Sequence, residues 1–412
     1  MATTHDIDQR LKQLRSGLLH YRADRNPVEH ATVQFHLGVT LLEAEQTPQA
    51  VAALRVAAEL FEREDRPVEY AKATNMLGVG LRGDGDAAGA AEAFARATDL
   101  FGEHGLHLEH GAALFNLGLV ERDRGDLDAA AERFRQAFQR FREEGPPGQA
   151  SAAGRELGAT LLSAGELDAA LEPLDTAIKS ATEAHDAAAA GAAANVLGLV
   201  HLAAERGEEA VEAFRTAVGT NPRSLRAEAY SMAKANLALA YEQVDDHPRA
   251  RLAARQARGT PAAAQPVVEQ ADAVLGRLGD GHDDLMIVLD QLPSDDRSRE
   301  AREEFVRWAD ADPDERRAAT GAWIDGQLAR RGAATELAYT YLDVLLEMPN
   351  EDMQAIIRST VEALQDRDAD DRERFRSQIS RAMARFHIPQ WDRLKAIFNR
   401  VGQEVGDDGT WE

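Results

Sequence analysis

The stretch LGLVERDRGDLDAAAERFRQA, residues 117–137, contains the pattern that decides the fold. It joins a Leu-Gly pair to Ala130, Phe134 and Ala137, a small, a large and a small side chain at helical spacing. Leu-Gly recurs every 40 residues without insertion, at 37–38, 77–78, 157–158 and 197–198, and the sixth copy reads Leu237-Ala238. Self-similarity at a fixed period indicates a repeat architecture, in which each unit buries its apolar face against the next.

Each 40-residue copy predicts a pair of helices. In the first full copy, Leu37, Leu41 and Leu42 lie on one face of a helix expected over roughly residues 31–44. A turn follows and holds Gly in three copies, as in Gly125-Asp126, which fits a helix end that needs a positive φ. The second helix carries the small and large columns, because small residues let two helices approach closely.

The repeat phase extends upstream of the first full copy. YRADRNPVEHA from Tyr21 matches FEREDRPVEYA from Phe61, 40 residues later. We therefore expect a half repeat at 8–27, followed by six 40-residue copies, within a repeat array that fills residues 1–260.

This pattern resembles the tetratricopeptide repeat, over about residues 8–260. The usual period of that family is about 34 residues, whereas the period here is 40, as in a longer subclass of the family. The family's aromatic residue early in the first helix is missing, and that column reads Gln34, Thr74, Leu114, Gly154, Ala194 and Lys234. The resemblance implies an all-α fold: a right-handed α-solenoid of about six repeats, followed by a C-terminal helical domain.

The resemblance also implies a concave groove, lined by the first helix of each repeat, that holds an extended peptide or a partner helix. Asn recurs in two adjacent groove columns, and its amide both donates and accepts hydrogen bonds, which suits a peptide backbone. Basic residues gather mid-groove, which on an acidic protein favours an acidic peptide. The predicted peptide-binding residues are Phe35, Lys72, Asn75, Arg82, Phe115, Asn116, Arg122, Arg155, Asn195 and Asn236. The alternative stays open that these Asn residues cap or cross-link neighbouring helices and that the Arg residues pair with acids of the next repeat.

The 40-residue phase ends near residue 260, where Thr260-Pro261 and Gln265-Pro266 interrupt the chain. We expect a capping helix or linker at 261–280 and a C-terminal helical domain at 281–412. Stripes at helical spacing, such as Leu337, Tyr341, Leu345 and Met348, predict four to six core-facing helices of no recognised family. Alternatively, one stripe, best the one at 389–405, is an exposed surface for a partner.

Composition excludes several classes of function. The 412 residues include 71 acidic and 47 basic ones, and the net charge of −24 disfavours nucleic-acid binding and docking on anionic membranes. The chain has no Cys, which excludes disulfides and thiolate metal sites. No apolar run approaches the roughly 18 residues of a membrane span, and no signal-peptide core is visible, so we expect a cytoplasmic protein.

Candidate chemistry is sparse, and we expect no enzyme activity, no cofactor and no metal. His104, His107 and His110 have the spacing of metal ligands, but the repeat places two of them in a linker and one in a helix's first turn. Acidic stretches from Asp310 and Asp366 lack the Gly and Glu that a calcium loop requires. Phosphate-loop and nucleophile motifs are absent from the sequence.

These features favour a non-catalytic scaffold or adaptor that binds an extended, acidic peptide or a partner helix. The C-terminal domain would provide a second interface or set the assembly state, homo-oligomerisation included. Two alternatives stay open: a regulatory protein that responds to a ligand or peptide, and an assembly or maturation factor for an enzyme complex.

Overall fold

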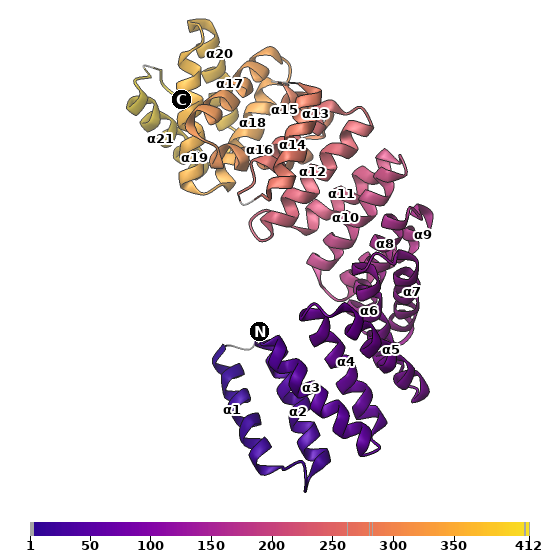
Figure 1. Ribbon diagram of the computed structural model, residues 1–412. Coiled ribbons are helices and arrows are strands. Elements are labelled where there is room, and N and C mark those ends of the chain that lie inside the picture. Colours follow the sequence, from indigo (N-terminus) through magenta and orange to yellow (C-terminus); the bar gives the residue numbers. More distant parts are fainter. Residues whose placement is uncertain (1–3, 262, 280, 282, 408, 412) are drawn as a thin grey trace. The chain divides into compact units, whose positions relative to one another are not determined.

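The computed structural model describes residues 4–261, 263–279, 281, 283–407 and 409–411, and the regular elements in this part of the chain are all helices (Figure 1). The contacts divide the chain into two compact units, with the boundary after Ala204. The all-α fold predicted from the repeats is therefore confirmed. The predicted boundary between the repeat array and a C-terminal domain, at 261–280, stays a prediction.

The N-terminal unit consists of helices of nearly equal length joined by short turns. They are α1 (Thr4–His20), α2 (Pro27–Glu43), α3 (Thr47–Arg63), α4 (Pro67–Gly83), α5 (Ala87–Glu103), α6 (His107–Asp123), α7 (Leu127–Glu144), α8 (Pro147–Ala164), α9 (Leu167–Glu183) and α10 (Ala187–Ala203). Each helix packs on the next one along the chain, so that α2–α3, α4–α5, α6–α7 and α8–α9 form hairpins and α1 packs on α2. The half repeat at 8–27 stays a prediction.

The small and large columns form the core of these hairpins. Leu174 on α9 is fully buried, and it lies against Gly158 on α8. A Cβ atom added at Gly158 would meet the Leu174 side chain at 2.4 Å, which is closer than non-bonded carbon atoms approach. The Leu-Gly motif is therefore explained by a close helix crossing, in which the glycine leaves room for the large residue of its partner helix.

The turn inside each hairpin needs one residue with a positive φ. That position recurs every 40 residues, with φ of 85° at Gly85 and 80° at Gly165. In other copies the same position holds Glu45, Glu205 or Asp245, with φ of 56–58°. The geometry of this helix end is thus kept throughout, although glycine occupies it in only three copies.

The C-terminal unit consists of helices of more varied length. They are α11 (Gly207–Thr220), α12 (Ala227–Gln243), α13 (His247–Arg258), α14 (Gln265–Leu278), α15 (Asp284–Gln291), α16 (Ser294–Asp310), α17 (Pro313–Ala329), α18 (Ala334–Glu347), α19 (Asn350–Gln365), α20 (Ala369–Met383) and α21 (Ile388–Val405). The last repeat comprises α12 and α13, and α14 packs on both of them.

Beyond α14 the packing changes, because helices two apart in sequence make the main contacts. One row comprises α16, α18 and α20, and a second row comprises α17, α19 and α21. An aromatic cluster lies at the centre, where Phe305 stacks on Trp308 at 4.5 Å and meets Trp323 and Tyr341 edge-on, both at 5.4 Å. On α21, Phe398 is fully buried, so that stripe contributes to the core and is not an exposed surface.

Candidate peptide-binding face

Nine of the ten predicted peptide-binding residues lie in the N-terminal unit, and Asn236, on α12, lies in the C-terminal unit. Helices α4, α6 and α8 carry seven of them. We call the surface formed by Asn75, Arg82, Asn116, Arg122, Asp123, Arg155 and Glu156 the α4–α8 face.

Three of the four predicted Asn residues contact other amides across neighbouring helices. The Asn116 side-chain nitrogen donates to the Asn75 side-chain oxygen over 3.5 Å, which links α6 to α4. Gln270 on α14 donates to the Asn236 side-chain oxygen at 3.0 Å, and Asn236 is buried. These contacts are the ones expected if the Asn residues cross-link helices. Asn75 and Asn116 are only partly buried, so they stay candidates for contact with a ligand.

The predicted Arg residues form a chain of ion pairs that crosses three helices. Arg82 on α4 donates to Asp123 on α6 through two nitrogens, at 3.0 and 2.8 Å. The neighbouring Arg122 contacts Asp123 at 3.4 Å and also pairs with Glu156 on α8. Arg155 completes the chain, at 2.8 Å from Glu156. Cations and carboxylates therefore alternate along the α4–α8 face. These five side chains comprise three arginines and two carboxylates, so they carry one more positive than negative charge.

The charge state of Asp123 follows from this arrangement. Partial burial alone would raise the pKa of its carboxyl group, but the hydrogen bonds and charges of Arg82 and Arg122 outweigh it and lower the pKa. Asp123 is therefore ionised at neutral pH, and its carboxylate forms ion pairs with Arg82 and Arg122.

A cavity of about 310 Å³ opens beside this carboxylate. Its lining joins apolar and polar groups of the first helices, with one aromatic ring from α5: Val79, Arg82, Gly83, Phe94, Asn116 and Asp123. A cavity of this kind, with an apolar wall and a few convergent polar groups, is typical of ligand sites in proteins.

The other predicted residues are placed less distinctively. Lys72 on α4 is exposed, and no ion pair of its ammonium group is seen among the described residues. Phe115 is partly buried and packs edge-on against Phe134 at 5.5 Å, so much of its ring supports the hairpin core. Phe35 on α2 is partly buried against the core of the first repeats.

A family model of the tetratricopeptide repeat matches residues 75–141, 120–185 and 155–224, which contain every residue of the α4–α8 face. This stretch is a tetratricopeptide-repeat array. The resemblance inferred from the Leu-Gly, Ala and Phe columns is therefore confirmed.

Solved structures of other proteins are similar to this chain at low sequence identity. The apo form of RapI is 12% identical, with a TM-score of 0.53 over 87% of this chain and 97% of RapI. BtubC from P. vanneervenii is 18% identical over 53% of this chain and 91% of BtubC, with a TM-score of 0.46. YrrB, described as a TPR protein with an unusual peptide-binding site, is 18% identical over 52% of this chain and 94% of its own, with a TM-score of 0.39. No curated protein matches the sequence.

The sequence analysis allowed for acids that pair with the Arg residues, but it did not identify the two carboxylates of the α4–α8 face, Asp123 and Glu156. Asp123 directly follows the column of Arg82 and Arg122, and Glu156 directly follows Arg155. Reading every first-helix column together with the residue next to it would have shown both acids. The pairing itself joins residues 41 and 34 positions apart, which a spacing of 40 does not reveal.

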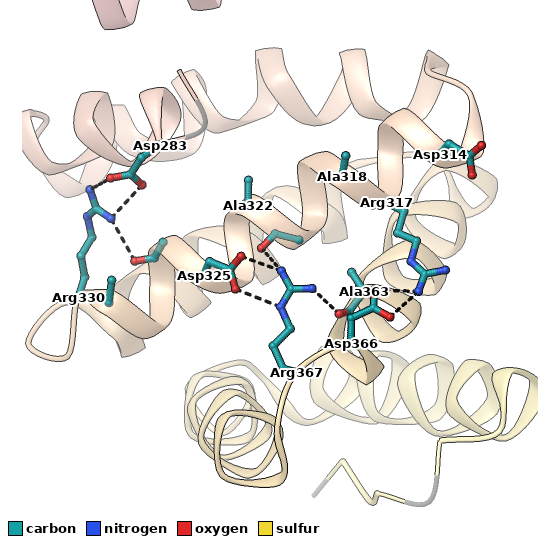
Figure 2. A pocket seen from close by; sticks show the side chains of 13 residues that line it. Asp283, Asp314, Arg317, Ala318, Ala322, Asp325, Arg330, Ala363, Asp366 and Arg367 are labelled. Atoms are coloured by element: carbon teal, nitrogen blue, oxygen red, sulfur yellow. Dashed lines mark hydrogen bonds and ion pairs between the residues drawn. The ribbon is translucent and has the colours of Figure 1, made fainter. Parts of the chain in front are cut away.

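A second and larger cavity, of about 620 Å³, lies along α17 in the C-terminal unit (Figure 2). Small residues such as Ala318 and Ala322 form part of its lining, and ion pairs cross it. Arg367 binds Asp325 at 3.0 and 2.7 Å. Two further pairs, Arg317 with Asp366 at 2.8 Å and Arg330 with Asp283 at 2.7 Å, tie α17 to its surroundings. All three arginines that line this cavity are thus committed to carboxylates of the same unit.

Metal binding receives no support from the residues that the structure describes, since no group of three His, Asp or Glu side chains converges there. His110 is partly buried, and burial, with the charges of Arg140 and His107, lowers the pKa of its imidazole. Likewise, no described helix has the length and apolar character needed to cross a bilayer.

Proposed function

We propose that this protein is a non-catalytic scaffold whose N-terminal tetratricopeptide repeats bind an acidic protein segment on the α4–α8 face. Tetratricopeptide repeats support a role in protein–protein interaction, because stacked hairpins present one extended surface to a partner. The observation that carries the choice of an acidic ligand is the alternating chain from Arg82 to Arg155. There, three guanidinium groups face two carboxylates.

The chemistry of that chain explains the preference. Each guanidinium has five N–H donors in a planar fork and no acceptor, so it retains donors after one or two ion pairs. Lys72 adds a further cation on α4. An approaching carboxylate would find donors on Arg82 and Arg122, and the amides of Asn75 and Asn116 lie close enough to bind the adjoining backbone.

The proposal is tested with hexaglutamate that carries fluorescein at its N-terminus and an amide at its C-terminus. Hexaglutamine with the same label and the same amide is the uncharged control. We expect hexaglutamate to bind the intact protein in a fluorescence anisotropy titration and hexaglutamine to bind much more weakly. Arg122→Ala should weaken hexaglutamate binding about tenfold or more, because charge-assisted hydrogen bonds are lost. Asn116→Ala and Arg155→Ala should weaken it as well.

Arg135→Ala is the matched control. Arg135 is an exposed arginine on α7 that pairs with Glu132 of its own helix, so its loss removes the same charge from another surface. Equal binding of the two peptides, or an equal effect of Arg122→Ala and Arg135→Ala, would contradict the proposed site.

A further inference from the structure

We propose that Asp123 is an internal stand-in for the ligand's carboxylate, which holds Arg82 and Arg122 until an acidic side chain of the bound segment displaces it. This inference rests on the proposed binding of an acidic segment and adds the residue that competes with that segment for the two arginines. It predicts that removing a negative charge from this position strengthens binding.

The position of Asp123 is the first argument. Its carboxylate lies between two guanidinium groups of adjacent first helices, at 2.8 Å from Arg82 and 3.4 Å from Arg122. It also lines the 310 Å³ cavity together with Arg82 and Asn116. A ligand carboxylate that entered this cavity would therefore meet Arg82, which donates the two shorter hydrogen bonds that Asp123 accepts.

The exposure of Asp123 is the second argument. Its side chain is 43% exposed, whereas that of Glu156, the other carboxylate in this series of ion pairs, is only 12% exposed. Glu156 is held by Arg122 and Arg155 from two sides, so it serves as a fixed anchor. Asp123 can rotate into solvent at little cost, because an exposed carboxylate is well hydrated and exposed ion pairs are weak.

The third argument is that both oxygens of Asp123 are in use, whereas the two arginines keep N–H groups to spare. Both oxygens of Asp123 accept hydrogen bonds, one from Arg82 and the other from Arg122. The two arginines retain further N–H groups. Displacement of Asp123 by a ligand therefore exchanges one carboxylate for another without leaving a guanidinium unpaired. A neutral peptide cannot make that exchange, and so the built-in acid favours acidic ligands over neutral ones.

The experiment compares Asp123→Asn and Asp123→Ala with the wild-type protein, using the same labelled hexaglutamate and hexaglutamine. We expect hexaglutamate to bind roughly threefold to tenfold more tightly to both variants, as fits the strength of an exposed ion pair. Hexaglutamine binding should not tighten. Two variants are used because Asn retains a polar group that contacts the arginines, whereas Ala removes it.

Glu132→Gln is the matched control for net charge, since Glu132 is an exposed acid on α7 that pairs with Arg135. If Glu132→Gln tightens binding as much as Asp123→Asn, the gain is a general charge effect and the inference is wrong. It is also wrong if wild type binds hexaglutamate and both Asp123 variants bind it equally or more weakly. If neither wild type nor any variant distinguishes hexaglutamate from hexaglutamine, the proposed function itself fails.

Discussion

At the scale of single residues, a close helix crossing depends on glycine where the partner helix places a large side chain against it. We predict that Gly158→Ala destabilises the protein by roughly 1–3 kcal/mol, because the new Cβ meets fully buried Leu174 and the core has no room to absorb it. Urea unfolding followed by circular dichroism measures the change. Gly148→Ala, on the same helix, is the control, since a Cβ there meets nothing within 4 Å.

Gly148→Ala should be neutral or slightly stabilising, because alanine in a helix restricts the unfolded chain more than glycine does. If both substitutions lowered the urea midpoint equally, the contact with Leu174 would not explain the glycine of the Leu-Gly motif.

The same columns show how far single residues were predictable. Gly158 and Leu174 stand in columns that hold a glycine and a large residue in five of the six copies, so their burial follows from the period alone. The partners of Arg82 and Arg122 do not follow from it, because a side chain six or seven bonds long reaches different neighbours depending on the offset between helices. Asp123 and Glu156 are recognised as partners only from the structure, which gives the offset between the helices.

At the scale of helices, a buried ion pair stands where the last repeat meets the following helices. Glu304 and Arg307 on α16 are both nearly inaccessible, and two nitrogens of Arg307 donate to one Glu304 oxygen, each at 3.1 Å. Nearby, Arg251 and Arg255 of α13 bind the buried Asp284 of α15, at 2.6 and 2.7 Å. Ion pairs of buried Asp284 thus join α13 to α15.

This arrangement predicts a pH-dependent stability. Burial would raise the pKa of Glu304, but the charges of Arg307 and Arg255, with hydrogen bonds from Arg307, lower it below the ordinary 4.5. A lowered pKa in the folded state means that this stabilisation is present above about pH 4.5 and is lost as the pH falls through the folded-state pKa. We predict that Glu304→Gln lowers the free energy of unfolding by roughly 1–3 kcal/mol at pH 7, since Arg307 loses its buried carboxylate partner and keeps only Glu315, at 2.6 Å.

Urea midpoints at pH 7 and at pH 3.5 measure this effect. The difference between wild type and Glu304→Gln should shrink at the lower pH, because the carboxyl group is then largely protonated in the unfolded chain, which removes part of the stabilisation that the lowered pKa gives the folded state. Glu172→Gln, whose ion pair with Arg142 is exposed, should show little difference at either pH. An undiminished gap at pH 3.5 would contradict the assignment of an ionised Glu304.

Helix existence was predictable in the C-terminal unit, whereas helix packing was not. The stripe of Leu337, Tyr341 and Leu345 predicts which face of α18 is buried, and all three residues are buried. Period alone does not say what covers that face. The main partners of α18 are α16 and α20, two helices away in sequence. Similarly, Lys234 was visible as a charge in an otherwise uncharged column, but its partner Glu303, at 3.7 Å, lies 69 positions further on, in α16.

At the scale of the whole molecule, net charge and local charge act over different distances. The net charge of −24 repels an acidic ligand at long range. At physiological ionic strength this repulsion is screened beyond about 8 Å. Contacts with Arg82, Arg122 and Lys72 act within a few ångströms and are screened less. An acidic protein can therefore bind an acidic segment where its cations are grouped, as they are on the α4–α8 face.

Stability within the repeat array should also vary along the chain, because each hairpin contacts mainly its neighbours. Helix α1 packs on α2 alone and fully buries only one apolar residue, Leu11, whereas α7 packs on both α6 and α8 and buries three phenylalanines. We predict that amides of α1 exchange with deuterium at least tenfold faster than those of α7, by local opening that leaves the other repeats folded. Hydrogen-exchange mass spectrometry on the intact protein measures this, and α18, which packs on α16 and α20 in the C-terminal unit, serves as a slow internal reference. Equal protection of α1 and α7 would mean that the array unfolds as one cooperative block, and the account of stability as a sum over neighbouring hairpins would then be wrong.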